Sequence, residues 1–249
     1  MFFEKKRDFY IFNILGIKIK FKIGKNYLTD KFLYNFHGDN NKLYVEKDGK
    51  LKERIKKIEG LNIDIKGDNN TITINEKSLK SFNNSDIKLR SNSTNIKIKD
   101  TDRLYNLHIG TCCGDNQSIY WGKGSNCWGV NVYLNEDNAS LVVGENCMFS
   151  GRIIIWATDG HAIIDKTTNK VINGIKSETK IGNHVWVGTR ATILKNADIP
   201  DNSVIGAGSV VTSKFDKGNV VIAGNPAKVI KENIDWDRRT SYRVEHNIK

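Results

Sequence analysis

Aliphatic residues recur at every sixth position through the C-terminal half of the chain. They are Ile175, Ile181, Val187, Ile193, Ile199, Ile205 and Val211. The fifth position of each hexad is small or β-branched, and its residues are Thr179, Val185, Ala191, Ala197, Ser203 and Ser209. A period of six fits neither an α-helix nor the two-residue alternation of an ordinary strand. It is typical of a parallel β-helix, in which each hexad forms one short flat side and a corner. We therefore predict an aliphatic interior with small residues at crowded corners.

The hexad frame breaks once, beside a histidine. Upstream it continues to Ile155, and the next in-frame position holds His161. The frame resumes only at Ile175, 20 residues after Ile155, which is not a multiple of six. We predict that residues 156–174 contain a loop that leaves the coil. If this loop replaces one coil, Ile155 and Ile175 lie over each other and His161 lies near the hexad 181–186.

The N-terminal half carries a looser repeat, in which an Asn/Asp/Gly turn precedes an alternating strand. Its units are residues 38–48, 67–77, 90–100, 114–124 and 135–145. They begin 29, 23, 24 and 21 residues apart, somewhat more than the 18 residues of three hexads. We expect each unit to add one coil with a protruding turn.

The chain is thus predicted to be one continuous solenoid in three parts. Residues 1–100 form irregular N-terminal coils and a cap, residues 101–228 form the regular hexapeptide-repeat β-helix with the chemistry, and residues 229–249 form a short helical tail. Because solenoid ends need caps, residues 1–35 are expected to cover the N-terminal end. The segment 51–58 is expected to be a short helical or loop insertion.

Composition and charge narrow the class of protein. The chain has 249 residues, a formal charge of +11 and two prolines, which indicates a globular protein and favours an anionic partner. Nucleic acid, an acidic glycan and a phosphorylated cofactor all fit this charge, as does a lysine-rich solvated surface. The apolar run 9–17 is too short to span a bilayer and lacks a cleavage site, so we expect no transmembrane segment. After it, residues 17–23 alternate as in a strand with one polar face.

The four cysteines point to a reducing compartment. They are Cys112, Cys113, Cys127 and Cys147, and no two of them form a CxxC pair. Without a signal peptide, we expect reduced core thiols in a cytoplasmic protein.

His161 is the first candidate for chemistry. It stands where the frame is otherwise aliphatic, borders the predicted loop and is flanked by Asp159 and Asp165. Histidine titrates near neutral pH and is a natural general base for a hydroxyl or an amine, with a carboxylate or carbonyl fixing its tautomer. The alternative is a structural role, which most single histidines have. His184, at the fourth position of its hexad, is the competing histidine.

Two further groups are candidates for binding. Trp186 occupies the outward last position of its hexad, where an indole binds a flat ligand or packs against the loop or another subunit. Lysines are concentrated where the hexads end, and they are Lys214, Lys217, Lys228 and Lys231. They suit phosphate groups or form a solvated basic cap. A metal site would need three grouped histidines, and the regular region holds only His161 and His184, so we expect no metal.

At these residues the sequence resembles a known family. The stretch HAIIDKTTNKVINGIKSETKIGNHVWVGTRATILKNADIPDNSVIGAGSVVTSKF, with VIAGNPAKVI after it, is similar to the hexapeptide-repeat acetyltransferases, which have a left-handed β-helix. It most resembles the bacterial sugar and capsule O-acetyltransferases, including the polysialic acid O-acetyltransferase group. The resemblance covers about residues 141–231. It also supplies the handedness, because the ordinary crossover rule favours a right-handed connection.

The resemblance implies a homotrimer that binds acetyl-CoA in a cleft between neighbouring subunits. It implies His161 as the general base and Trp186 as a wall of the site, and we add Asp159 to the catalytic candidates. The implied acetyl-CoA contacts are Trp186, Gly188, Thr189, Ala207, Thr212, Lys214, Pro226, Lys228 and Lys231. Lys214 follows Ser213, one position later than the lysine of many relatives.

The predicted activity is transfer of acetyl from acetyl-CoA to a hydroxyl of a bacterial surface glycan, of capsule, lipopolysaccharide or sialic-acid type. The charge favours an anionic acceptor. Two alternatives stay open: an acetyltransferase for a small molecule such as an antibiotic, serine or an amino sugar, and a non-catalytic glycan-binding solenoid. Nucleic-acid binding fits the charge, but no helix or aromatic platform for it is present in the sequence.

Overall fold

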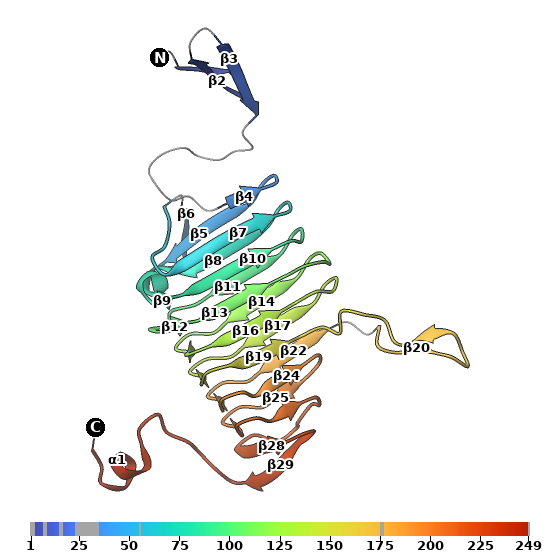
Figure 1. Cartoon of the computed structure of the whole chain (residues 1–249). Coiled ribbons are helices and arrows are strands. Elements are labelled where there is room, and N and C mark those ends of the chain that lie inside the picture. Colours follow the sequence, from blue (N-terminus) through green and yellow to red (C-terminus); the bar gives the residue numbers. More distant parts are fainter. Residues whose placement is uncertain are drawn as a thin grey trace.

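The computed structural model describes residues 3–6, 9–14, 17–22, 35–54, 56–174 and 177–248. From residue 35 onward the chain winds as a left-handed β-helix, and its coils stack along one axis (Figure 1). Parallel strands of successive coils form three flat sheets around an aliphatic interior. The predicted all-β solenoid is therefore confirmed.

The described strands of the solenoid fall into three sheets of eight strands each. Sheet 1 holds β4 (Asn35–His37), β7 (Leu61–Lys66), β10 (Ser85–Leu89), β13 (Leu107–Gly110), β16 (Val130–Tyr133), β19 (Ile153–Trp156), β24 (Thr192–Leu194) and β27 (Val210–Val211). Sheet 2 holds β6 (Lys50–Glu53), β5 (Lys42–Lys47), β8 (Thr71–Asn75), β11 (Asn95–Ile98), β14 (Ser118–Trp121), β17 (Ser140–Val143), β22 (Glu178–Ile181) and β25 (Asp198–Ile199). Sheet 3 holds β9 (Phe82–Asn83), β12 (Leu104–Tyr105), β15 (Asn126–Cys127), β18 (Met148–Phe149), β23 (Trp186–Val187), β26 (Val204–Ile205), β28 (Val220–Gly224) and β29 (Ala227–Glu232).

The hexad pattern predicts the interior correctly. The aliphatic positions that the structure describes are all buried: Ile181, Val187, Ile193, Ile199, Ile205 and Val211. The small fifth-position residues are buried with them, at the crowded corners. Burying one such aliphatic side chain contributes roughly 1.5–3 kcal/mol, so the stacked rows supply much of the stability. Ile175 lies outside the described residues.

The looser N-terminal repeat is also confirmed as one coil per unit. Each of its five turns leads into a strand of sheet 2, and these strands pair in chain order as β5, β8, β11, β14 and β17. The inward residues stand in register along this row, and they are Leu43, Ile72, Ile96, Ile119 and Leu141. Coils of unequal length thus align because the flat sides match while the turns absorb the extra residues.

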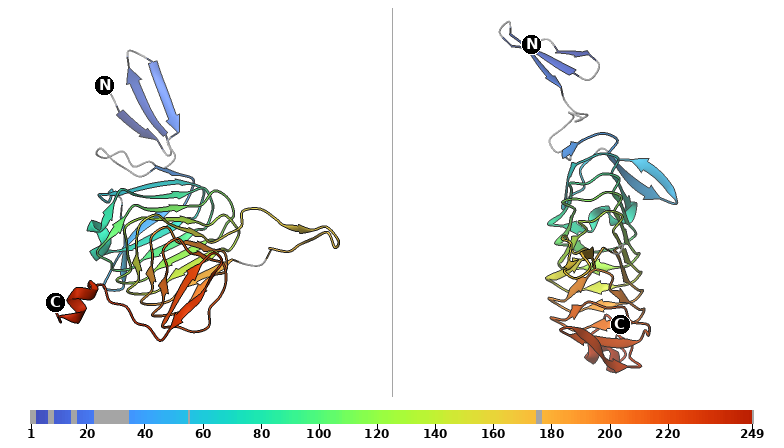
Figure 2. Two further views of the ribbon diagram at one scale, coloured as in Figure 1. Left: turned by 60° about the horizontal axis from the view of Figure 1, so that its bottom comes forward. Right: turned by 90° about the vertical axis from the view of Figure 1, so that its right-hand side faces the viewer.

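Both ends of the solenoid differ from expectation. In the segment 51–58, residues 51–53 belong to β6, which pairs antiparallel with β5 in a hairpin that Figure 2 shows standing out from the coils. Residues 54 and 56–58 form a loop, as one of the two expectations has it. The tail is only partly helical, because residues 227–232 form β29, antiparallel to β28. The helix α1 covers Ser241–Glu245 alone. A tail that can still pair with the last coil gains backbone hydrogen bonds that a free helix would not.

The N-terminal segment contains a separate three-stranded antiparallel sheet. Its strands are β1 (Phe3–Lys6), β2 (Phe9–Ile14) and β3 (Ile17–Lys22). The strand predicted over residues 17–23 is therefore present from Ile17 to Lys22, while its polar face and Ile23 lie outside what the structure describes. The capping role of residues 1–35 stays a prediction.

The loop that follows Trp156 is inserted at a corner and does not replace a coil. The chain passes in turn through sheets 2, 3 and 1, and the loop leaves between sheet 1 and sheet 2 with β20 (Ile164–Asp165) and β21 (Lys170–Val171) at its tip (Figure 1). Ile155 pairs with Val132 on one side and with Ile193 on the other. Ile175, which the frame predicts over Ile155, is outside the described residues. An excursion at a corner leaves the flat sides in register.

The prediction that the cysteines are core thiols is wrong for two of the four residues. All four thiols are free, but only Cys127 and Cys147 are buried. Cys112 and Cys113 are exposed because they lie in the turn between β13 and β14. Burial raises the pKa of Cys127 to about 12 and that of Cys147 to about 11. Within the described residues, no helix is long and apolar enough to cross a bilayer.

Candidate active site

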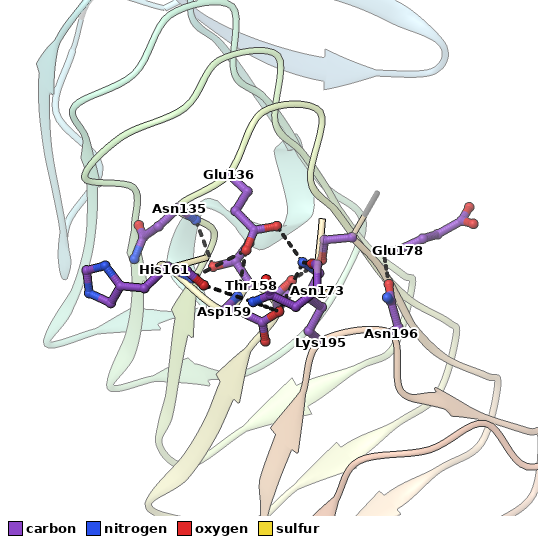
Figure 3. A network of polar contacts seen from close by, with 12 residues as sticks. Asn135, Glu136, Thr158, Asp159, His161, Asn173, Glu178, Lys195 and Asn196 are labelled. Carbon is purple, nitrogen blue, oxygen red and sulfur yellow. Dashed lines mark hydrogen bonds and ion pairs between the residues drawn. The ribbon is translucent and has the colours of Figure 1, made fainter. Parts of the chain in front are cut away.

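The base of the loop is fastened by a polar network (Figure 3). The Nζ atom of Lys195 lies 2.8 Å from Oε2 of Glu136 and 3.2 Å from Oδ2 of Asp159. The Asn173 side-chain amide donates to Oδ2 of Asp159 at 2.9 Å and to the backbone oxygen of His161 at 2.8 Å. Oε1 of Glu136 accepts the Asp159 backbone N–H at 2.7 Å. The network ties both ends of the loop to the coils and fixes the backbone at His161.

Lys195 is the centre of this network. Its side chain is only 8% exposed. Burial works to lower the pKa of a lysine, but the hydrogen bonds to Glu136 and Asp159 outweigh it and raise the pKa of Lys195. The lysine thus stays charged at neutral pH. Sequence reasoning missed it, because Glu136 lies 59 residues away and no local pattern connects the two.

His161 is exposed at the foot of the loop, and its imidazole points away from the network (Figure 3). Among the described residues, no side chain hydrogen-bonds the ring. The flanking carboxylates are engaged elsewhere: Asp159 faces Lys195 and Asn173, and Asp165 accepts the backbone N–H groups of the turn after it. Those hydrogen bonds, with that of Thr168 first, lower the pKa of Asp165. The imidazole is therefore free to meet a group from outside the chain.

Trp186 lies on the outer surface of sheet 3. Its side chain is 37% exposed, as its outward slot predicts, and its indole N–H donates to Oγ of Ser150 at 3.3 Å. In a prism of three sheets, the corner between sheets 1 and 2 lies opposite sheet 3. His161 and Trp186 are consequently on opposite sides of one chain, with the interior between them.

The corner from sheet 3 to sheet 1, which we call the 3–1 edge, carries the first group of predicted acetyl-CoA contacts. On successive coils its turns are residues 150–152, 188–190 and 206–208. Gly188 packs so closely on the next coil that an added Cβ would lie 2.7 Å from the backbone of Ala207. Thr189 and Ala207 are exposed beside it, and the Thr189 hydroxyl donates to the Gly151 carbonyl at 2.8 Å. Gly188, Thr189 and Ala207 thus leave a narrow strip of small side chains, and the exposed Arg190 follows them in the turn.

The other predicted contacts are divided between two places. Pro226, Lys228 and Lys231 lie on the β28–β29 hairpin, next along from the 3–1 edge, and are exposed. Thr212 and Lys214 lie instead at the corner between sheets 1 and 2, where the backbone of Lys214 forms an isolated parallel β-bridge with that of Asp198. The lysines therefore do not form one cluster.

Two further basic or aromatic candidates are engaged within the chain. Lys217 pairs with Glu232, so it is not free for a phosphate. His184 is stacked under Trp236 of the tail, with ring centroids 4.3 Å apart, and its carbonyl accepts the Trp236 indole N–H at 2.7 Å. The tail thus covers the competing histidine and leaves His161 as the free one.

Comparison with known proteins agrees with this geometry. Residues 178–213 match the family model described as bacterial transferase hexapeptide (six repeats). The chain is 35% identical over 141 residues to galactoside O-acetyltransferase of Escherichia coli (strain K12), covering 52% of this chain and 67% of the relative. It is 32% identical over 191 residues to polysialic acid O-acetyltransferase of Neisseria meningitidis, covering 70% of this chain and 88% of the relative.

A solved structure shows the same similarity along most of the chain. The polySia specific acetyltransferase NeuO matches with a TM-score of 0.58 and 25% identity, covering 84% of this chain and 89% of that one. The fold, the repeat and the length of the shared sequence lead to one conclusion: the chain belongs to the hexapeptide-repeat acetyltransferases and is an acyltransferase.

Proposed function

We propose that the protein transfers acetyl from acetyl-CoA to a hydroxyl of a bacterial surface glycan, at sites formed between the subunits of a homotrimer. The observation that carries the proposal is His161 itself: an exposed imidazole without a partner, held at the foot of a loop by a buried ionic network. Relatives named as O-acetyltransferases of a galactoside and of polysialic acid support a sugar acceptor.

The position of Trp186 supports a site shared by two subunits. Because His161 and Trp186 lie on opposite sides of one chain, they meet only if the loop of one subunit faces sheet 3 of its neighbour. A cyclic trimer brings one surface of each chain against a different surface of the next, which such a shared site requires. Three equivalent sites result.

The 3–1 edge fits the donor. Small residues at Gly188 and Ala207 leave room for a thin pantetheine arm, and Thr189 offers a hydroxyl beside it. Lys228 and Lys231 on the terminal hairpin suit the CoA phosphates at the far end. In this arrangement the thioester lies near Trp186 and the phosphates lie toward the C-terminal coils. Thr212 and Lys214, at the other corner, reach the donor from the adjacent subunit.

The reaction follows from a general base beside a thioester. His161 takes the proton of the acceptor hydroxyl while its oxygen attacks the thioester carbonyl. Backbone N–H groups stabilise the oxyanion. The C–S bond then breaks, and the imidazolium returns its proton to the CoA thiolate. Asp159 acts in this scheme as a positioning residue, because its contacts with Lys195 and Asn173 fix the loop rather than the imidazole ring.

The test is release of CoA thiol from acetyl-CoA with a panel of acidic and neutral oligosaccharides, using His161→Ala as the control. The proposal expects release with at least one glycan and its loss in the variant. Release only with a small acceptor such as serine or chloramphenicol would replace the glycan by a small molecule. Failure to bind acetyl-CoA would overturn the enzyme reading in favour of a glycan-binding solenoid.

A further inference from the structure

The N-terminal part of the 3–1 edge carries large aromatic side chains where the later coils carry small ones. Tyr105 is the last residue of β12, and Trp128 directly follows β15. In register they stand at the edge position that Ser150 and Gly188 occupy after β18 and β23. Trp128 is 52% exposed. The rings of Tyr105 and Trp128 meet edge to face, with centroids 5.5 Å apart. An exposed and orientated indole at this position is a platform for a ligand rather than part of the core.

A guanidinium accompanies these rings. The Cζ atom of Arg103 lies 4.7 Å from the centroid of the Trp128 ring and 5.9 Å from that of Tyr105. In the part of the chain that the structure describes, Arg103 forms no ion pair. The neighbouring carboxylate, Asp102, accepts from the Asn126 amide at 3.2 Å. The Arg103 guanidinium thus lies over the indole of Trp128, and its charge is not neutralised by a described partner.

A second cation lies on the same edge, in an unusual backbone conformation. Arg152 has φ +59°, a left-handed conformation that favours glycine and asparagine. The shorter turns of earlier coils hold Asn84 and Asn106 in this conformation. The next coil repeats the arginine, as Arg190 with φ +60°, and the coil after it holds Gly208. Arg152 is exposed, and its side chain forms no ion pair with a described residue. A strained position that keeps a bulky cation points to a use for the side chain.

The aromatic and cationic residues lie on different coils of the 3–1 edge from the residues assigned to acetyl-CoA. The positions assigned to acetyl-CoA run from Trp186 toward the C-terminal hairpin. Arg152, Trp128 and Arg103 lie on the other side of Trp186, on the preceding coils. Coils are spaced by one strand separation, so the row from Arg103 to Arg152 extends over roughly 10 Å. That length exceeds one sugar ring and therefore suits more than one unit of a chain.

We propose that Arg103, Trp128 and Arg152 form a binding track for the carboxylate-bearing sugars of an extended acceptor. The indole packs against the apolar C–H face of a sugar ring, and each guanidinium takes a carboxylate through paired N–H donors. The track rests on the proposed function for its relation to the acetyl group, since it leads toward Trp186. It assigns the N-terminal coils to acceptor selection.

The test uses the full chain with oligosaccharides of sialic acid or galacturonic acid, and with their carboxyl-reduced, uncharged forms. The variants are Arg152→Asn, which preserves the left-handed turn as in Asn84 and Asn106, and Trp128→Ala. The control is Arg243→Gln, which removes the same charge from the exposed face of α1. We expect kcat/KM for the acidic oligosaccharide to fall roughly tenfold or more in both variants and not in the control. The KM for acetyl-CoA stays unchanged, and Arg152→Asn spares the uncharged form.

Other results overturn the track. Equal losses on charged and uncharged oligosaccharides show that Arg152 does not read a carboxylate. A raised KM for acetyl-CoA that disappears with dephospho-CoA as the carrier assigns Arg152 to the donor phosphates. If the wild-type chain acetylates no glycan, the proposed function fails. Binding to the track can then still be measured by tryptophan fluorescence titration with the acidic oligosaccharide. Binding that Arg152→Asn abolishes supports the track, and no binding by the wild-type chain refutes it.

Discussion

The coils before Ser150 and those after it share one interior and have different edges. In both halves, β-branched and aliphatic residues stack in register, as Ile96 does on Ile119 and Ile181 does on Ile199. At the 3–1 edge, however, the earlier coils present Trp128 and the later ones present Gly188. The interior allows little variation because its rows are close-packed. The edges vary freely, so one repeat can place the proposed donor strip and the proposed acceptor track end to end.

The two corners that border sheet 1 differ in a second way. The 3–1 edge is continuous from coil to coil, whereas the opposite corner is interrupted by the loop with His161. A regular corner is stabilised by each neighbouring coil. At the interrupted corner the loop itself leaves the stack, and Lys195 of the next coil holds its base through Glu136 and Asp159. This difference predicts that chemistry is more sensitive to changes at the loop than to changes at the regular edge.

The largest expected effect is at the loop. His161→Ala should lower kcat by roughly 10²–10⁴-fold, the usual range for loss of a general base. Its dissociation constant for acetyl-CoA should stay at the wild-type value, since the imidazole lies outside the donor strip. Rates are measured by CoA release and affinity by calorimetry. A variant that keeps most of its turnover would remove His161 from the mechanism.

Lys195→Met should come next. It removes the cation but not the volume, and it leaves Glu136 and Asp159 facing each other. We expect about 1.5–3 kcal/mol less stability, from the lost hydrogen bonds between charged groups, together with a lower kcat. The matched control is Lys180→Met, whose partner Glu178 is solvent-exposed, and there the change should stay within about 0.5 kcal/mol. Denaturant unfolding and kcat are measured for both, and equal effects would show that the network does not hold the loop.

Two glycines on one edge sharpen the contrast between coils. Gly188→Ala places a Cβ against the backbone of Ala207 and should cost about 1–2 kcal/mol of unfolding free energy. Gly151→Ala, one coil earlier, meets nothing within 4 Å and should be close to neutral. Thermal and denaturant unfolding compare the two variants. If both are neutral, the later coils are not packed as closely as the structure shows.

The smallest effect concerns thiol reactivity. Near pH 8, Cys112 and Cys113 should react with Ellman's reagent in the folded protein, while Cys127 and Cys147 should react only after unfolding. Both buried thiols have a raised pKa, of about 12 and about 11, so they remain protonated as well as shielded. Four equivalents of fast reaction without denaturant would contradict the buried assignment.

The features of the fold and the site that repeat every six residues could be predicted from the sequence. The rows of Ile193 and its equivalents, the outward Trp186 and the loop beside His161 all follow from the sixfold frame. The corner at which the loop leaves did not, because a break in a frame does not say whether a coil is lost. The Lys195 network and the left-handed Arg152 were invisible, since they depend on residues or dihedral angles that only stacking brings together. The hairpin of β6 and the strand β29 were missed because charged edge strands resemble loops and helices in composition.

The central claim is that each site needs His161 of one subunit and Trp186 of the next, and subunit mixing tests it most directly. His161→Ala and Trp186→Ala are each purified and assayed, then co-expressed in equal amounts. Each variant alone should be at least tenfold impaired. Averaged over all randomly assembled trimers, about a quarter of the sites combine an intact loop with an intact indole, so activity should return to about a quarter of the wild-type value. Activity no higher than the average of the two variants would contradict a site shared between subunits.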